Sequence, residues 1–365
     1  MAIARPRFSR TQHAEFFNTL RTRVNQYFES NNISRYGNYK LVFKTIFMLA
    51  LFLVPYFLVL FGAVTSTWLS LLMWGIMGLG TAGIGLSIMH DANHGVLSRY
   101  KWLNKVMEHT IDIVGGNASM WKKKHNVLHH TFTNVDGQDD DIHAPFILRF
   151  SPHQPLRKIH RFQHWYAWIF YSMLTLMWIT YSDFKSVFRF REEGMIRNSK
   201  EFRKEFWQVA GWKLFYYAYL LVLPIIFAAA PFWVTLIGFI IMHLVTGLML
   251  SVIFQLAHVM PECEFPMPDD KGLIDSNWAV HQMSTTTNFA PNNKLMSWFI
   301  GGLNYQVEHH LFTNISHVHY PEISKIVQQT AREFGVPYYS EPRFFKALAN
   351  HARMLRSLGQ PEMAA

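Results

Sequence analysis

Two long stretches of this 365-residue chain contain no Lys, Arg, Asp or Glu. The first lies between Lys44 and Asp91, and the second lies between Lys213 and Glu262. Because a membrane-spanning helix needs about 20 apolar residues, each stretch is long enough for two such helices. The charged fraction of 16% is also low, since soluble domains carry roughly 25% charged residues. The sequence therefore predicts four spans, at residues 45–64, 66–89, 208–229 and 232–257.

The basic residues predict the side of the membrane on which the polar segments lie. The two short reversals lack positive charge, whereas the N-terminal arm, the 99–213 segment and the C-terminal tail are rich in Lys and Arg. These three regions are expected to share the cytoplasmic side. Polar sequence follows the first arginines, so we expect a retained anchor and no cleaved signal peptide. The net charge of +10 suits anionic lipid headgroups, and no module for binding nucleic acid accompanies it.

The chain shows no internal repeat and is expected to form a single domain, 1–365. The predicted fold is an all-α integral membrane protein with two helical hairpins and a cytoplasmic helical cap. One apolar stretch, 164–181, is near the lower length for a span. Its Trp and Tyr content favours a helix lying in the interface. The expected segments are a basic arm (1–44), the first hairpin (45–89), the cap (90–207), the second hairpin (208–257) and a tail (258–365).

Histidines gather in motifs that follow predicted spans or lie in the polar segments. HDANH and HNVLHH each hold a pair spaced i, i+4, and such pairs share one face of an α-helix. QVEHH adds two more, and QLAH ends the fourth span. With four spans, all of them emerge on one side. The candidate residues are His90, His94, His125, His129, His130, His258, Gln306, His309 and His310.

A metal centre explains these clusters better than separate structural roles do. A lone histidine is more often a hydrogen-bonded structural residue. For these clusters, however, such a structural role would have to arise separately in each one. A proton relay suits neutral imidazoles, yet it does not need so many. Eight imidazoles exceed any mononuclear site and match a dinuclear one. Two closed zinc sites would leave no place for a reaction. Iron with open positions can activate O₂, and the membrane offers acyl chains as C–H-rich substrates.

The motifs HDANHG, WKKKHNVLHHTFTN and GGLNYQVEHHLF resemble the three histidine boxes of the membrane fatty-acid desaturases. Gln306, in place of the first histidine of box three, is similar to the front-end branch of delta-6 and delta-5 type. The resemblance covers about residues 40–330. It implies a desaturase that inserts a cis double bond between an existing one and the carboxyl end of an acyl chain. Regiochemistry and the CoA, carrier-protein or glycerolipid head remain open at this point.

The resemblance also implies a di-iron centre. Its ligands would be the eight histidines given above, with Gln306 as a further candidate; His281 is left out. The reaction would use two iron ions, O₂ and two electrons. No HPGG-containing cytochrome b5 module occurs in the sequence, so the electrons are expected from a separate ferredoxin or cytochrome b5 with its NAD(P)H reductase. The expected partners are this donor, the fatty acyl substrate and the lipid bilayer, with no nucleic acid; a homo-oligomer stays open.

Several residues near the boxes have two readings. Asp91, Asp139, Asp140 and Asp141 could orient ligand imidazoles, although at least one of the last three is expected in a solvated turn. Lys122, Lys123 and Lys124 could meet a substrate head group, and a snorkelling basic patch is an equal alternative. His243 lies about four turns before His258 on a helix, too far to share its metal. It is expected as a buried hydrogen-bonding residue or part of a tunnel wall.

Two rival functions follow from the same residues. The first is a hydroxylase, ketolase or other di-iron oxidase on the same scaffold. The second is a membrane metal transporter or haem protein. Transporters place their ligands near the middle of the membrane, whereas these boxes lie beyond the ends of the spans. The single Cys263 excludes an intramolecular disulfide and thiolate clusters.

Overall fold

The computed structural model describes residues 5–9, 13–143 and 146–363. Their contacts divide the chain into two compact units. The first unit comprises Asn38–Lys122 and Ile169–Ser251. The second unit comprises the described residues among 4–37, 123–168 and 252–365. Each unit draws on separate parts of the sequence.

Four helices are long and apolar enough to cross a membrane, which confirms the predicted number of spans. They are Tyr39–Leu60, Thr67–Asn93, Ser199–Phe227 and Phe232–His258. The first and third begin earlier than predicted, because the polar and basic residues before the apolar runs continue the helices. The chain is an integral membrane protein. The corresponding elements are α2 (Tyr39–Leu60), α3 (Thr67–Gly83), α4 (Met89–Asn93), α12 (Ser199–Tyr217), α13 (Leu223–Phe227) and α14 (Phe232–His258).

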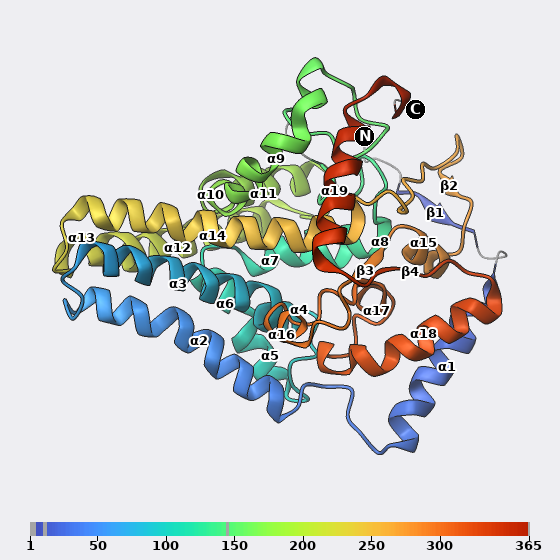
Figure 1. Ribbon diagram of the computed structural model, residues 1–365, viewed down its shortest axis with the longest axis horizontal. Coiled ribbons are helices and arrows are strands. Elements are labelled where there is room, and N and C mark those ends of the chain that lie inside the picture. The colour runs from blue at the N-terminus through green and yellow to red at the C-terminus, as the bar shows by residue number, and fades with distance from the viewer. Residues whose placement is uncertain (1–4, 10–12, 144–145, 364–365) are drawn as a thin grey trace. The chain divides into compact units, whose positions relative to one another are not determined.

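Helices α2 and α3 lie side by side in the first unit (Figure 1). Their approach depends on a small residue, since a Cβ on Gly80 would lie 2.7 Å from the backbone nitrogen of Phe52. Small residues bring membrane helices into close van der Waals contact in this way. The opposite side of α2 carries exposed apolar residues, such as Val42, Phe43 and Ile46, each at least 60% exposed. A bilayer would cover such a surface.

A buried ion pair lies in the first unit. Lys213 in α12 and Asp183 are both almost fully buried, with Nζ 2.6 Å from the carboxylate. The same ammonium donates to the carbonyls of Gly115 and Trp178, at 2.5 and 3.1 Å. The Trp178 indole donates to the other carboxylate oxygen at 2.9 Å. These bonds satisfy both charges inside the protein, as burial requires.

Substitution of Lys213 by methionine is expected to lower the free energy of unfolding by about 3 kcal/mol, because it leaves the Asp183 charge buried and unpaired. Thermal unfolding of the purified protein in detergent measures the loss. The double variant Lys213→Met/Asp183→Leu removes both charges and should recover much of the stability. An unchanged melting temperature in Lys213→Met would contradict the assignment of a stabilising pair.

Shorter helices fill the rest of the first unit. They are α5 (Lys101–Glu108), α6 (Thr110–Ile113), α7 (Ala118–Lys122), α10 (Leu174–Met177) and α11 (Asp183–Glu192). Helix α9 (Gln163–Ser172) begins in the second unit and ends in the first. The stretch predicted to be interfacial, 164–181, is therefore helical, and it is not among the four helices that could span a membrane.

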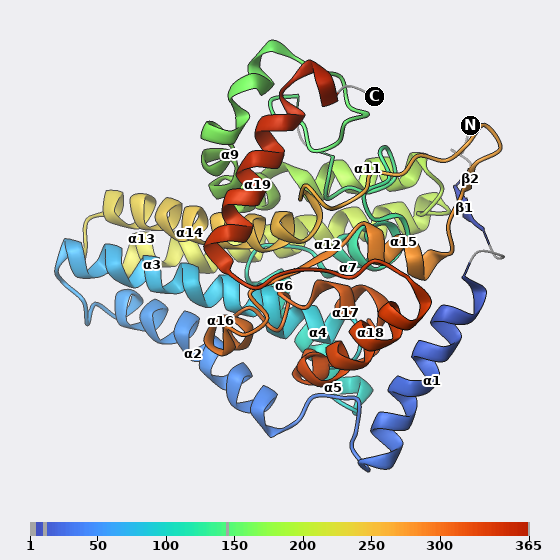
Figure 2. The same cartoon turned by 45° about the vertical axis from the view of Figure 1, so that its right-hand side comes forward.

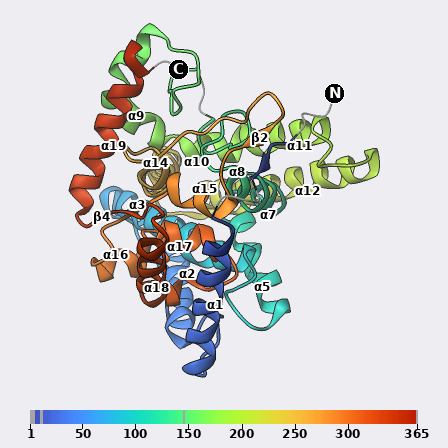
Figure 3. The same cartoon turned by 90° about the vertical axis from the view of Figure 1, so that its right-hand side faces the viewer.

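The second unit has a core built around two amphipathic helices, α1 (Ala14–Ser30) and α18 (Tyr320–Phe334), which Figure 3 shows close together. Buried apolar residues recur every fourth position in α1, from Phe16 to Phe28, and face α18. This spacing forms one stripe on a helix. An ion pair of Arg23 and Glu333, at 2.6 Å, joins the two helices. The basic arm predicted from charge is thus in large part a packed helix.

The other helices of the second unit are short, apart from the one near its C-terminus. They are α8 (His130–Phe132), α15 (Trp278–Ser284), α16 (Lys294–Phe299), α17 (Gln306–Leu311) and α19 (Phe344–Leu358). Two parallel strand pairs join distant segments. β1 (Arg7–Phe8) pairs with β2 (Leu273–Ile274), and β3 (Thr287–Phe289) pairs with β4 (Tyr339–Glu341). In the sequence, α16 lies between β3 and α17, the helix that carries the last histidine motif.

Candidate metal centre

The HNVLHH motif does not form the regular α-helix that the i, i+4 spacing suggested. Residues Lys123–His129 form a π-helical turn, and α8 begins at His130. Such turns pair residues five apart and are frequent at functional sites. Nε2 of His125 therefore lies 3.0 Å from Nε2 of His130. The prediction had placed His130 on a flanking face; the wider turn brings it to His125.

Three buried histidines of the second unit converge on one point. His129, His258 and His310 come from the π-helical turn, the end of α14 and α17, respectively. One ring nitrogen of each lies within 4.8 Å of the others. Metal–imidazole bonds of about 2.0–2.1 Å place opposite ligands roughly 4.2 Å apart. The spacing is therefore close to that of ligands around one ion.

The Nδ1 atoms of two of these rings are held by acceptors. His129 Nδ1 lies 3.0 Å from the Asp139 carboxylate, and His258 Nδ1 lies 3.2 Å from the carbonyl of Thr285. Among the described residues, the buried Nε2 atoms of His129 and His258 have no hydrogen-bond partner. Metal-bound histidines typically bind an acceptor through one nitrogen and the metal through the other. The arrangement fits a cation at the Nε2 side.

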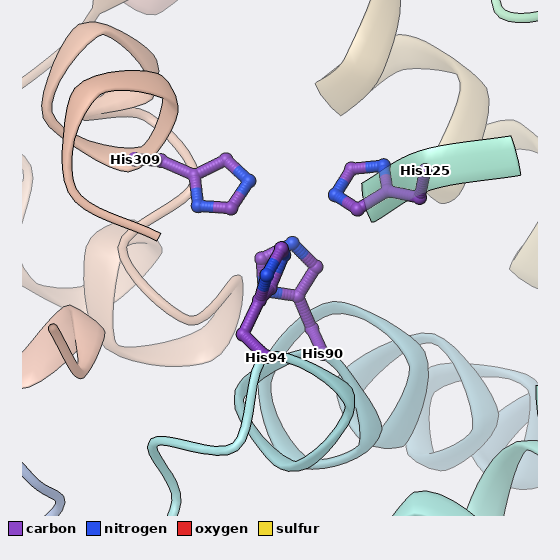
Figure 4. A group of neighbouring side chains, drawn as sticks. All are labelled: His90, His94, His125 and His309. Carbon is purple, nitrogen blue, oxygen red and sulfur yellow. The ribbon is translucent and has the colours of Figure 1, made fainter. Parts of the chain in front are cut away.

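Helix α17 presents His309 and His310 from adjacent positions. His310 Nδ1 lies 2.7 Å from the Gln282 side-chain oxygen, which also accepts a hydrogen bond from Thr133. His309 Nδ1 lies 3.2 Å from the Tyr320 hydroxyl. The rings of His309 and His125 are nearly parallel, with centroids 5.7 Å apart (Figure 4).

Buried polar contacts hold α17 in place. The Glu308 carboxylate is fully buried and accepts hydrogen bonds from Asn288 at 2.8 Å and Tyr338 at 3.1 Å. Burial raises the pKa of Glu308 to about 7. Asn288 also accepts a bond from the backbone of Val307 at 2.9 Å. The strand β3 thereby fixes the first turn of α17.

Negative charge favours a cation at the site. Burial lowers the pKa of His129, but the Asp139 carboxylate outweighs burial and raises the pKa to about 9. Burial also acts to raise the pKa of Asp139, yet His129 holds it below its ordinary value. Asp141 lies 3.4 Å from His129, and burial raises its pKa to about 6. The same charges that favour a proton on His129 would stabilise a bound metal ion.

In the first unit, His90 and His94 project from one end of the second span (Figure 4). Their ring centroids are 4.8 Å apart, and the Trp121 ring lies against both, at 5.7 and 5.8 Å. The helix continues past the predicted end at residue 89 and stops just before Gly95. This glycine has φ of +76°, a conformation that glycine adopts readily. A π-helical turn, Ile84–Ile88, precedes the pair.

The remaining predicted residues have different surroundings. Gln306 is buried at the start of α17, and its Nε2 has no hydrogen-bond partner among the described residues. Asp91 is buried with its carboxylate 3.9 Å from His90 Nδ1. Asp140 is half-buried in the turn between its two neighbours. His281 is buried against Phe8, with ring centroids 5.0 Å apart.

The three lysines before box two are all partly buried. Lys122 forms an ion pair with Glu108, with Nζ 3.0 Å from the carboxylate, so a substrate head group would have to compete with Glu108. Lys123 and Lys124 are half-buried.

His243 in α14 is fully buried, with Nε2 2.7 Å from the Tyr216 hydroxyl and Nδ1 3.0 Å from Thr175. It is a hydrogen-bonding residue, one of its two expected roles.

Asp139 was among the residues expected to orient an imidazole, but sequence reasoning missed other residues that hold the histidine rings. Gln282, Thr285 and Tyr320 carry no metal-ligand signature, and Thr285 acts through its backbone carbonyl. Asn134 was missed as well. Its φ is +60°, and its side chain donates to the carbonyl of His258 at 2.9 Å. An asparagine directly after a histidine motif tolerates this left-handed backbone, and that was the one available signal.

Buried histidines that converge with anchored rings at the end of a membrane span have the chemistry of a metal site in a membrane enzyme. The donors are imidazoles, which suit iron, copper, zinc and nickel. The comparison with known proteins agrees with this class. Residues 66–342 match the family model described as "Fatty acid desaturase". The chain belongs to this family and is an enzyme, a fatty acid desaturase.

Several curated relatives are similar over nearly the whole chain. The sn-1 linoleoyl-lipid 6-desaturase of Arthrospira platensis is 38% identical, covering 96% of this chain and 94% of that protein. The sn-1 linoleoyl-lipid 6-desaturase of Synechocystis sp. is 36% identical, covering 96% and 97%. The acyl-lipid (8-3)-desaturase of Physcomitrium patens is also 36% identical, covering 97% of this chain and 74% of that protein.

Proposed function

We propose that this enzyme inserts a cis double bond at carbon 6, counted from the carboxyl end, of a linoleoyl chain in a membrane glycerolipid. The observation that carries the proposal is the similarity to the two cyanobacterial linoleoyl-lipid 6-desaturases, which extends over at least 94% of each protein. Gln306 in box three supports the front-end branch. A delta-5 position is the second candidate, because relatives such as the delta(5) fatty acid desaturase A of Dictyostelium discoideum are also similar.

The proposed ligands of two iron ions are the seven histidines of the three boxes and His258 at the end of the fourth span. The fit at His129, His258 and His310 supports the first ion. His125 and His309 are proposed for the second, together with His130 and the pair His90 and His94. The ligand count supports this set, because one ion cannot accept eight imidazoles. Gln306 is proposed as a weaker ligand or as the holder of a water molecule.

Bound iron would supply the activation of O₂ that removal of hydrogen from an unactivated C–H bond requires. The protein's own residues would hold the ligands and position the chain. Asp139, Thr285 and Gln282 orient three imidazoles through Nδ1, so that the Nε2 atoms keep a fixed geometry. The regiochemistry depends on holding carbons 6 and 7 beside the centre, which is a positioning task. Two electrons per turnover would come from a separate ferredoxin or cytochrome b5.

We further propose that the spans form two hairpins with the metal centre on the cytoplasmic side. The uncharged reversals and the basic polar segments support this orientation. The helical stretch 164–181 is proposed to lie in the interface. Its exposed Trp165 and Tyr181 are of the type found at membrane–water boundaries.

Expression in a host that makes linoleoyl lipids but no delta-6 fatty acids tests the reaction. We expect a linoleoyl-derived product with a new cis double bond at carbon 6 in the glycerolipid fraction, mapped by gas chromatography–mass spectrometry of double-bond derivatives. A parallel culture with His258→Gln is the control. A hydroxylated chain without a new double bond would contradict the proposal. A new double bond at carbon 5 would instead support the second candidate, a delta-5 desaturase.

A further inference from the structure

A basic groove lies in the second unit between the start of α9 and the end of α19, which run close together in Figures 2 and 3. It has a volume of about 650 Å³. Its charged and aromatic lining residues are Arg161, Phe162, His164, Trp165, Arg356 and Glu362. None of these residues belongs to a histidine box, and the proposed reaction does not use them.

Buried polar side chains fix the two walls of the groove to each other. Gln163 is fully buried and donates from Nε2 to the carbonyls of Arg149, at 3.0 Å, and Leu355, at 2.8 Å. Arg149 is also fully buried and donates to the carbonyl of Leu358 at the end of α19. The chain leaves α19 at Gly359, where a Cβ would lie 2.2 Å from the carbonyl oxygen of His160. These contacts therefore fix the backbone from which the Arg161 and Arg356 side chains project.

The charge of the groove favours an anion. Arg161 and Arg356 are exposed, and the one carboxylate among the lining residues is that of Glu362. His164 also lines the groove, and its buried Nδ1 has no hydrogen-bond partner among the described residues. Burial and the nearby Arg356 lower the pKa of His164, which favours its neutral ring. Guanidinium groups bind phosphate and related anions through paired N–H donors.

The surface around the groove favours a membrane lipid over a soluble anion. Trp165 is 75% exposed and Phe162 is 56% exposed at its edge. Nearby Phe146 is 71% exposed, with the Arg157 guanidinium 5.6 Å from its ring centre. Exposed aromatic rings beside Arg are typical of helices that lie in the headgroup region. A soluble phosphate would leave these rings in water.

We propose that this groove binds the headgroup of an anionic membrane lipid. Arg161 and Arg356 contact the anionic group, His164 supplies a further hydrogen bond, and Trp165 and Phe162 enter the interfacial layer beside it. The site would fix the start of α9 at the membrane surface. It needs neither the metal centre nor a turnover, so it stands independently of the proposed reaction.

Titration of the full-length protein in a neutral detergent tests the proposal. The probes are short-chain phosphatidylglycerol, short-chain phosphatidylcholine and inorganic phosphate, and calorimetry gives the Kd. We expect phosphatidylglycerol to bind at least tenfold more tightly than phosphatidylcholine. In Arg161→Gln/Arg356→Gln, its affinity should fall roughly thirtyfold, about 2 kcal/mol, as expected for two cations near an anionic lipid surface. Glu362→Gln should bind it two- to fivefold more tightly.

The control variant Arg21→Gln/Arg332→Gln removes two other exposed arginines of the same unit. We expect its Kd for phosphatidylglycerol to stay within twofold of the wild type. Both double variants should have the melting temperature of the wild type, since the four guanidinium groups are exposed. Equal loss in the two double variants, or equal binding of the two lipids, would overturn the proposal. Full competition by inorganic phosphate at the concentration of the lipid would show a free-phosphate site and overturn the lipid assignment.

Discussion

Replacement of His258 by glutamine is expected to reduce desaturation at least about 100-fold and to lower the iron bound per chain. This histidine ends the fourth span, outside the three boxes. The Thr285 carbonyl holds its Nδ1, and one of its ring nitrogens lies within 4.8 Å of ring nitrogens of His129 and His310. Loss of an outer partner of a ligand already costs 10–100-fold, and loss of the ligand itself should cost at least as much. Product analysis and metal quantification on the purified enzyme measure the two effects.

His281→Gln is the matched control for this experiment. His281 is also buried in the second unit, yet it belongs to none of the groups of potential ligands among the described residues. The variant should keep the iron content of the wild type and most of its activity. Loss of iron in His281→Gln together with retention of iron in His258→Gln would indicate that His281 and not His258 binds iron. This result would contradict the proposed ligand set.

Asp139→Asn is expected to lower activity and iron affinity by 10–100-fold. The Asp139 carboxylate holds His129 Nδ1 at 3.0 Å and accepts backbone hydrogen bonds from Asn134 and Asp141, at 2.9 and 3.0 Å. An amide keeps much of this shape but removes the negative charge that favours a cation at His129. Iron affinity is measured by competition with a chelator, and activity by product formation under saturating iron.

Asp136→Asn is the control, because it makes the same change of charge in the same turn. Asp136 accepts a hydrogen bond from Gln154 at 3.0 Å, which an asparagine oxygen can still accept. Its activity should remain within about twofold of the wild type, as for an ordinary surface substitution. If the two variants lose iron equally, the effect comes from the net charge of the turn and not from the contact with His129.

The spans could be predicted from the sequence because their signal is local. An uncharged run of about 20 residues has one stable place, the bilayer, whatever the rest of the chain does. The ends of the spans were less accurate. The partner of Lys213 was not predicted either: this lysine lies inside the predicted third span, 208–229, where Asp183 neutralises it. Only the packed structure brings that partner to it.

The histidine motifs by themselves indicated a metal centre, since imidazoles in such number and spacing have few other uses. The tertiary structure decided how the rings are held. The contact of His125 with His130 depends on a π-helical turn that α-helical spacing does not predict. Gln282 reaches Thr133 across 149 positions of the chain. Contacts of this kind depend on how distant segments pack, and the residue types alone do not encode them.

The sequence by itself determined the membrane class, the four spans and the histidine clusters that are candidates for metal binding, because hydrophobic length and ligand chemistry act on short segments. Only the tertiary structure decided the apolar stripe of α1 against α18, the acceptors behind the ligand rings and the groove of Arg161 and Arg356. Each of these joins parts of the chain that are far apart in sequence. Burial and hydrogen bonding fix them, and both act only once the chain has folded.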